Sequence, residues 1–237
     1  MEQREFVHRA DGEELSCTAC IPAGDERLER VVIMHGAGTG SKQRNLPLAR
    51  EFARAGYRSL AFDFSGHGRS TGELPLLSLE RRFLQARSVI AEFAPDGPVM
   101  LIGFSMSGQT IADVVEHLGD RVTTIVLGAP AAYSAAAWKV PFGSGFTEII
   151  RTADSWRASP AFDTYARFTG RAVLIVPDHD SVIPPGVTSR IEAALRRHAA
   201  FDRIVFPGSQ HTLGLWLAEH PEDRRRIVAL CAAPGHP

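Results

Sequence analysis

Six short runs of apolar residues, rich in branched side chains, recur along the chain. They alternate with longer stretches that are apolar on one side only. The runs span residues 31–36, 58–64, 99–105, 123–129, 172–178 and 202–208. Each run is nearly continuous in apolar residues, which is typical of strands covered on both faces. The pattern therefore predicts a buried parallel sheet rather than a sheet with one face in water.

The stretches between these runs have apolar residues at a spacing near 3.6, as amphipathic helices do. In the clearest of them, 79–93, five apolar residues share one face, and Ser78 is suited to cap the first turn. Another helix is expected to begin near Asn45 and Pro47 and to end at Gly56. Further helices are expected at 107–118, 187–199 and 221–232.

Strand, helix and strand, repeated in this way, predict a parallel sheet with right-handed crossovers. Before the first run, two strand-like stretches, 4–10 and 14–22, flank Asp11-Gly12, which is a hairpin signal. Together these features predict a single α/β domain over residues 1–237. Its sheet is expected to be mostly parallel and eight-stranded, with helices on both faces.

One segment interrupts the alternation. Between residues 131 and 170 no strand is expected, and the segment is rich in aromatic residues. A connection this long within a compact domain is usually a functional insertion. We interpret it as a lid over the substrate; the alternative is a helical excursion whose aromatic residues pack on the sheet. The residues expected to bind substrate are Trp138, Phe142, Phe146 and Trp156.

Composition and charge narrow the class of protein. Hydrophobic residues make up 44% of the chain and charged residues 22%, and the net charge is −1, without a block of like charge. This argues against electrostatic capture of nucleic acid. We find neither a signal-peptide pattern nor an apolar run long enough to span a membrane, so a cytoplasmic protein is expected. Cys17 and Cys20 alternate to opposite faces of one predicted strand, which favours packing thiols over a metal or redox pair.

Several polar residues with catalytic chemistry follow the predicted strands. Ser105 ends the third run, Asp178 and Asp180 follow the fifth, and His211 follows the last. Ligands of an open parallel sheet bind at the carboxyl ends of its strands. We therefore expect a serine, an acid and a histidine to meet at one edge of the sheet.

Five short motifs carry a resemblance to a known family. They are HGAG (35–38), DFSGHGRS (63–70), GFSMSG (103–108), DSVIP (180–184) and GSQHT (208–212). In this order they resemble α/β-hydrolases, nearest to the branch of serine aminopeptidases, monoacylglycerol lipases and intracellular esterases. The resemblance covers almost the whole chain and implies the α/β-hydrolase fold with a Ser-His-Asp triad. One position departs from it, because the GxSxG motif expects glycine where this chain has Ser107.

Ser105 is the expected nucleophile, because a sharp strand-to-helix turn would lift its hydroxyl out of the sheet. The alternatives are a helix cap at Ser105 and Ser107 as the nucleophile. Among nine histidines, His211 is the expected base because it follows the last strand. By resemblance the acid precedes a V-I-P turn, which selects Asp180 over Asp178. The resemblance also implies an oxyanion hole formed by the backbone N–H groups of Ala37 and Met106.

The expected activity is hydrolysis of an ester or thioester of an apolar acyl or aryl group, through an acyl-enzyme on Ser105. Neither a metal nor an organic cofactor is implied. One alternative keeps the triad for acyl transfer, cyclisation or carbon–carbon cleavage; another is a noncatalytic binding protein of the same fold. A carrier-tethered substrate and a homodimer are left open. So is the role of the cations between residues 131 and 170, which could meet an anionic group or face solvent: Lys139, Arg151 and Arg157.

Overall fold

The computed structural model describes residues 1–233; the end of the expected domain, 234–237, lies outside the described residues. Its centre is an eight-stranded sheet in the order β1-β2-β4-β3-β5-β6-β7-β8. The strands are β1 (Glu2–Ala10), β2 (Glu13–Ile21), β3 (Arg30–Met34), β4 (Ser59–Phe62), β5 (Val99–Phe104), β6 (Val122–Gly128), β7 (Arg171–His179) and β8 (Ala200–Gln210). Only β1–β2 and β2–β4 pair antiparallel; the other five pairs are parallel. The mostly parallel, eight-stranded sheet is confirmed.

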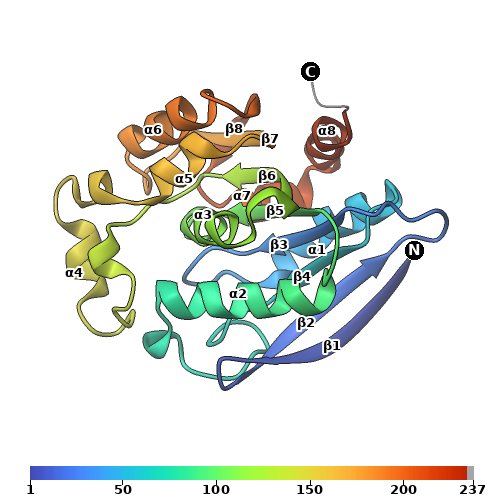
Figure 1. Cartoon of the computed structure of the whole chain (residues 1–237), viewed down its shortest axis with the longest axis horizontal. Coiled ribbons are helices and arrows are strands. Elements are labelled where there is room, and N and C mark those ends of the chain that lie inside the picture. Colours follow the sequence, from blue (N-terminus) through green and yellow to red (C-terminus); the bar gives the residue numbers. More distant parts are fainter. Residues whose placement is uncertain (234–237) are drawn as a thin grey trace.

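Helices cover both faces of this sheet (Figure 1). One face carries α1 (Lys42–Arg54), α7 (Leu213–Glu219) and α8 (Pro221–Ala232). The other carries α2 (Leu79–Phe93), α3 (Ser107–Leu118), α5 (Ala161–Arg167) and α6 (Pro185–Leu195). The two faces divide the core in two, and Cys17 and Cys20 of β2 are buried on opposite sides, as their alternation predicted.

The start of α1 differs from expectation. The helix begins at Lys42, before Asn45 and Pro47, so that Pro47 lies inside it. The reason is a distant cap: the carboxylate of Asp63, just after β4, accepts a 2.6 Å hydrogen bond from the Lys42 N–H. An acid at a helix N-terminus satisfies an otherwise unpaired donor and interacts favourably with the helix dipole.

Segment 131–170 contains no strand, as expected, and consists of η3 (Ala135–Ala137), α4 (Phe146–Arg151), η4 (Ser155–Ala158) and α5. Its first half is tied to the chain around the start of α2, where Phe142 N–H donates to Leu77 O over 2.8 Å and Gly143 N–H to Pro75 O over 2.9 Å. In Figure 1, α4 lies at one side of the molecule and the hairpin of β1 and β2 at the other.

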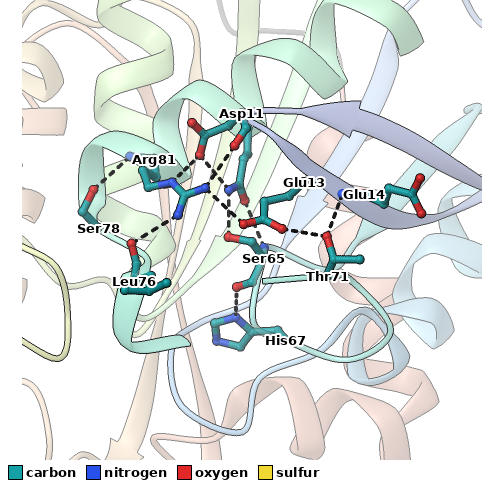
Figure 2. Close-up of polar contacts among 10 residues, drawn as sticks. Asp11, Glu13, Glu14, Ser65, His67, Thr71, Leu76, Ser78 and Arg81 are labelled. Carbon is teal, nitrogen blue, oxygen red and sulfur yellow. Dashed lines mark hydrogen bonds and ion pairs between the residues drawn. The ribbon is translucent and has the colours of Figure 1, made fainter. Parts of the chain in front are cut away.

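The tip of this hairpin is joined to α2 by a polar network (Figure 2). The Arg81 guanidinium donates to Asp11 Oδ2 over 2.5 Å and to Glu13 Oε1 over 3.3 Å. Gln85, one turn further along α2, donates to Asp11 and to Ser65. The network therefore links the hairpin, α2 and the loop after β4.

No helix within residues 1–233 combines the length and the apolar character needed to cross a bilayer.

Candidate active site

The turn between β5 and α3 holds Ser105 in a conformation that few residues adopt. Its φ is +51°, in the left-handed region, which is strained for a residue with a Cβ. The turn is fixed by the backbone: Ser105 N–H donates to Gly128 O over 2.8 Å, and Ser105 O accepts from Gly108 N–H and Ala131 N–H. A side chain at Gly108 would lie 2.7 Å from Pro130 Cβ, so this close approach requires glycine. The sequence predicted such a turn from the small residues beside Ser105.

The three residues expected to form a triad are brought together. His211 Nε2 lies 3.0 Å from Ser105 Oγ, and His211 Nδ1 lies 3.0 Å from Asp180 Oδ2. A carboxylate only accepts hydrogen bonds, so Nδ1–H donates to Asp180 and Nε2 is left to accept from the serine hydroxyl. The second oxygen of Asp180 accepts the N–H groups of Val182 and Ile183 over 2.8 and 3.0 Å. The acid is therefore held by its own turn.

Asp178, the alternative acid, has different partners. Its Oδ2 accepts the Gly208 N–H over 2.9 Å, and its own N–H donates to Ser209 Oγ over 3.2 Å. These bonds join the ends of β7 and β8. Asp178 thus supports the loop that carries His211 rather than the imidazole itself.

The two expected oxyanion donors lie beside the serine. Met106 directly follows Ser105, and Ala37 lies in the loop after β3. Within the described residues, neither backbone N–H donates to another group of the protein. Gly36 packs directly on Ser105, since a Cβ at Gly36 would lie 3.1 Å from Ser105 Cβ. The geometry leaves both N–H groups available for a bound oxygen.

Two other histidines near the site are buried and neutral. His35 Nδ1 donates to Gly36 O over 2.6 Å, while Nε2 accepts the Phe64 N–H over 3.1 Å. Burial lowers the pKa of His35 well below its usual value. His67, whose Nδ1 lies 3.0 Å from Ser65 O, has its pKa lowered to about 4, chiefly by burial. Both stabilise loops at this edge of the sheet.

A cavity of about 240 Å³ opens at Ser105 and His211. Its wall includes residues that the sequence interpretation did not select, above all those of α7 and the turn after Asp180. Leu215 of α7 and Val182 are 44% and 60% exposed, so both offer apolar surface at the mouth of the cavity. The leucines that closely follow His211 in the sequence, beginning with Leu213 and Leu215, could have indicated an apolar wall beside the site. The newly identified wall residues are Arg44, Asn45, Phe104, Val182, Leu213 and Leu215.

The four aromatic residues expected to bind substrate are not part of this wall, as far as the described residues define it. Phe146 is buried in a small cluster with Met106, and Phe142, Trp138 and Ala37 pack against that cluster. Trp156 instead packs on Phe162. Three of the four thus belong to the cluster that also contains Met106 and Ala37, the two expected oxyanion donors.

No metal site accompanies this arrangement: residues 1–233 contain no group of three or more His, Cys, Asp and Glu side chains placed to hold an ion.

Comparisons with known proteins agree with this fold. Residues 25–158 match the sequence profile of the family described as serine aminopeptidase, S33. Monoglyceride lipase from Rattus norvegicus is 33% identical over 103 residues, which are 42% of this chain and 33% of the lipase. The match thus spans about a third of that relative's length.

Solved structures are similar over almost the whole chain. Est1E from Butyrivibrio proteoclasticus, with ferulic acid bound, has a TM-score of 0.74 at 14% identity and covers 96% of this chain and 100% of its own. The thioesterase domain from the curacin biosynthetic pathway has a TM-score of 0.71 at 15% identity, over 97% and 99% of the two chains. At such low identity these likenesses establish the fold alone. Since the family profile matches more than half of the chain and the fold agrees with it, this chain belongs to the serine aminopeptidase S33 family of α/β-hydrolases.

Proposed function

We propose that this protein is a serine hydrolase that cleaves an ester or thioester of an apolar acyl or aryl group. The observation that carries the proposal is the continuous contact from Asp180 through His211 to Ser105, with 3.0 Å at each step. This contact ends in a cavity beside two free backbone donors. A nucleophile, an oriented base and an oxyanion site are the parts that acyl transfer to water requires.

In the proposed reaction, Ser105 Oγ attacks the substrate carbonyl while His211 Nε2 takes the hydroxyl proton. Asp180 keeps Nδ1 protonated and stabilises the imidazolium that forms. The N–H groups of Ala37 and Met106 donate to the oxyanion of the tetrahedral intermediate. Collapse of this intermediate releases the alcohol or thiol, which receives the proton from His211. Water, activated by the same imidazole, then hydrolyses the acyl-enzyme.

The proposed substrate class is supported by the cavity wall. The exposed Val182 and Leu215 offer apolar contact at the catalytic groups, where an acyl or aryl group would bury them. The names of similar proteins favour the same class, since one relative is a monoglyceride lipase and one solved structure is a thioesterase domain.

We propose further that segment 131–170 is a lid and that Phe142 and Trp138 contact longer acyl chains. Both side chains are partly exposed and pack against the cluster that contains Met106. A chain that leaves the cavity past Ala37 would reach this cluster. The lid would then influence chain length, whereas the triad would act on any activated ester.

The experiment is a series of p-nitrophenyl esters from acetate to dodecanoate, with acyl thioesters in parallel. Hydrolysis is expected to depend on Ser105: Ser105→Ala should lower kcat by at least about 10⁴-fold, as removal of a triad nucleophile does. Ser144→Ala, an exposed serine of segment 131–170, is the matched control and should hydrolyse at the normal rate. Ester hydrolysis that survives Ser105→Ala would contradict the proposal.

A further inference from the structure

Arg82 of α2 is completely buried, yet within residues 1–233 its guanidinium forms no ion pair with a carboxylate. Its charge is instead placed 3.7 Å from the centre of the Phe64 ring. Burial lowers the pKa of Arg82 to about 9, which still leaves the side chain a cation at neutral pH. A buried cation without a counter-charge is costly. We therefore ask which hydrogen bonds of Arg82 offset the cost of burying its charge.

These contacts converge on one carbonyl. Arg82 Nη2 donates to His35 O and to Ser107 Oγ, both over 2.8 Å. Nε makes a longer contact of 3.5 Å with Thr110 Oγ1, and Nη1 has no partner among the described residues. Ser107 Oγ in turn donates to His35 O over 2.7 Å. One nitrogen and one hydroxyl thus form a closed triangle with the His35 carbonyl oxygen.

The His35 carbonyl belongs to the loop that carries the oxyanion donor. The next residue, Gly36, packs on Ser105, and the Gly36 carbonyl accepts a hydrogen bond from His35 Nδ1. Ala37, which supplies the proposed N–H, follows directly. Fixing the His35 carbonyl therefore fixes the direction in which this loop leaves β3.

The triangle also gives a role to the departure from the GxSxG motif. Glycine at position 107 would have no hydroxyl to accept from Arg82 or to donate to His35. Ser107 packs closely as well, since a Cβ at Gly103 would lie 2.8 Å from Ser107 Cβ. Serine is thus the small residue that fits this approach and completes the triangle.

We propose that Arg82 and Ser107 are positioning residues, which act on catalysis by holding the His35 carbonyl so that the Ala37 N–H meets the oxyanion. The inference rests on the proposed function, because it assigns these residues to the same oxyanion site. It adds a pair of buried groups that touch neither the substrate nor the reacting atoms.

The test compares Arg82→Met and Ser107→Ala with Arg81→Met, a matched control on the adjacent residue. Arg81 lies in the network of Figure 2, on the side of the hairpin tip. Rates on p-nitrophenyl butyrate are divided by the concentration of active sites. That concentration is found by labelling a separate sample of each variant to completion with a fluorophosphonate. Affinities are measured for an alkyl trifluoromethyl ketone, which forms an oxyanion on the serine, and for the matching methyl ketone.

Arg82→Met should lower kcat about 10- to 100-fold, as expected when an oxyanion donor is misplaced. Ser107→Ala should lower it about 3- to 10-fold, because one of the two bonds to His35 O remains. The trifluoromethyl ketone should lose affinity in parallel with kcat, while KM and methyl ketone affinity stay within about 3-fold. Because both residues hold one carbonyl, the double variant should lose less than the product of the single losses. Arg81→Met should lower Tm and leave these ratios unchanged.

A merely structural role predicts a different result. If Arg82→Met lowers Tm while kcat per site and trifluoromethyl ketone affinity stay normal, the inference is overturned. Should Arg82→Met fail to fold, the same measurements are made on Ser107→Ala and Arg82→Lys. Normal kcat per site and normal trifluoromethyl ketone affinity in both variants would overturn the inference. If the unmodified protein neither hydrolyses esters nor reacts with the fluorophosphonate, the proposed function fails, and the inference fails with it.

Discussion

The two aspartates at the end of β7 are chemically identical and two residues apart, yet they have different partners: Asp178 belongs to the last residues of the strand and Asp180 directly follows it. Asp180 lies against the imidazole of His211, whereas Asp178 accepts the N–H of Gly208. Strand alternation could not separate them, because it points both residues to the same side. The register of β7 against β8 shifts between Pro177 and His179, so alternation does not continue through this stretch. Only the resemblance of the V-I-P turn favoured Asp180.

Asp180→Asn should lower kcat by about 10³- to 10⁴-fold, because the amide no longer keeps the imidazole in the correct tautomer. The asparagine oxygen can still accept the N–H groups of Val182 and Ile183, so Tm should change little. Asp178→Asn is the matched control; it should lower kcat less than about 5-fold and weaken a loop bond that contributes about 1 kcal/mol. Kinetics and thermal melting of both variants check the assignment. A large loss of kcat in Asp178→Asn alone would reverse the two roles.

At the level of elements, long apolar runs were predicted well and distant contacts were not. Each of the six runs overlaps a strand, and the two differ at their ends by a few residues. The agreement arises because a strand buried on both faces must be continuously apolar. The predicted start of α1 was wrong because Asp63, from another part of the chain, caps the helix at Lys42. Helix α7 was not expected, since its seven residues include Gly214 and are too few for a clear period. That short helix supplies part of the cavity wall.

The proposed lid gives an element-scale prediction. Phe142→Ala should lower kcat/KM for a dodecanoate ester more than for an acetate ester, because only the long chain reaches the cluster beside Ala37. Phe146→Ala is the comparison: its side chain is only 4% exposed, so its loss should lower Tm and affect both esters alike. Measuring both esters and Tm for the two variants separates contact with substrate from packing. If the ratio of the two esters is constant in Phe142→Ala, segment 131–170 does not select chain length.

Across the whole molecule, the edge of the sheet that carries the site is also where neutral histidines are buried. His67 has a folded pKa of about 4, chiefly because of burial, and its Nε2 has no partner within residues 1–233. In the unfolded chain the imidazole binds a proton near pH 6.5, whereas in the folded protein it binds one only at lower pH. The contribution of His67 to stability is therefore fully present above about pH 6.5 and is lost as the pH falls toward 4. This loss can amount to about 3 kcal/mol.

His67→Gln should flatten the acid side of the stability profile, because an amide does not titrate but can donate to Ser65 O as the imidazole does. Urea unfolding at pH 6.5 and pH 4.5 should show a smaller difference in unfolding free energy than in the unmodified protein. The exposed His198 provides the control, and His198→Gln should leave the difference unchanged. Equal differences in all three proteins would contradict a buried, neutral His67.

The central claim is that Ser105 is the nucleophile, and one labelling measurement tests it most directly. The protein is treated with a fluorophosphonate, digested, and the modified residue is located by peptide mass spectrometry. The account predicts one adduct, on Ser105, with no adduct in Ser105→Ala. The positive φ and the contact with His211 distinguish this serine from the neighbouring Ser107, whose hydroxyl is bonded to Arg82 and His35. An adduct on Ser107, or labelling that persists in Ser105→Ala, would contradict the account.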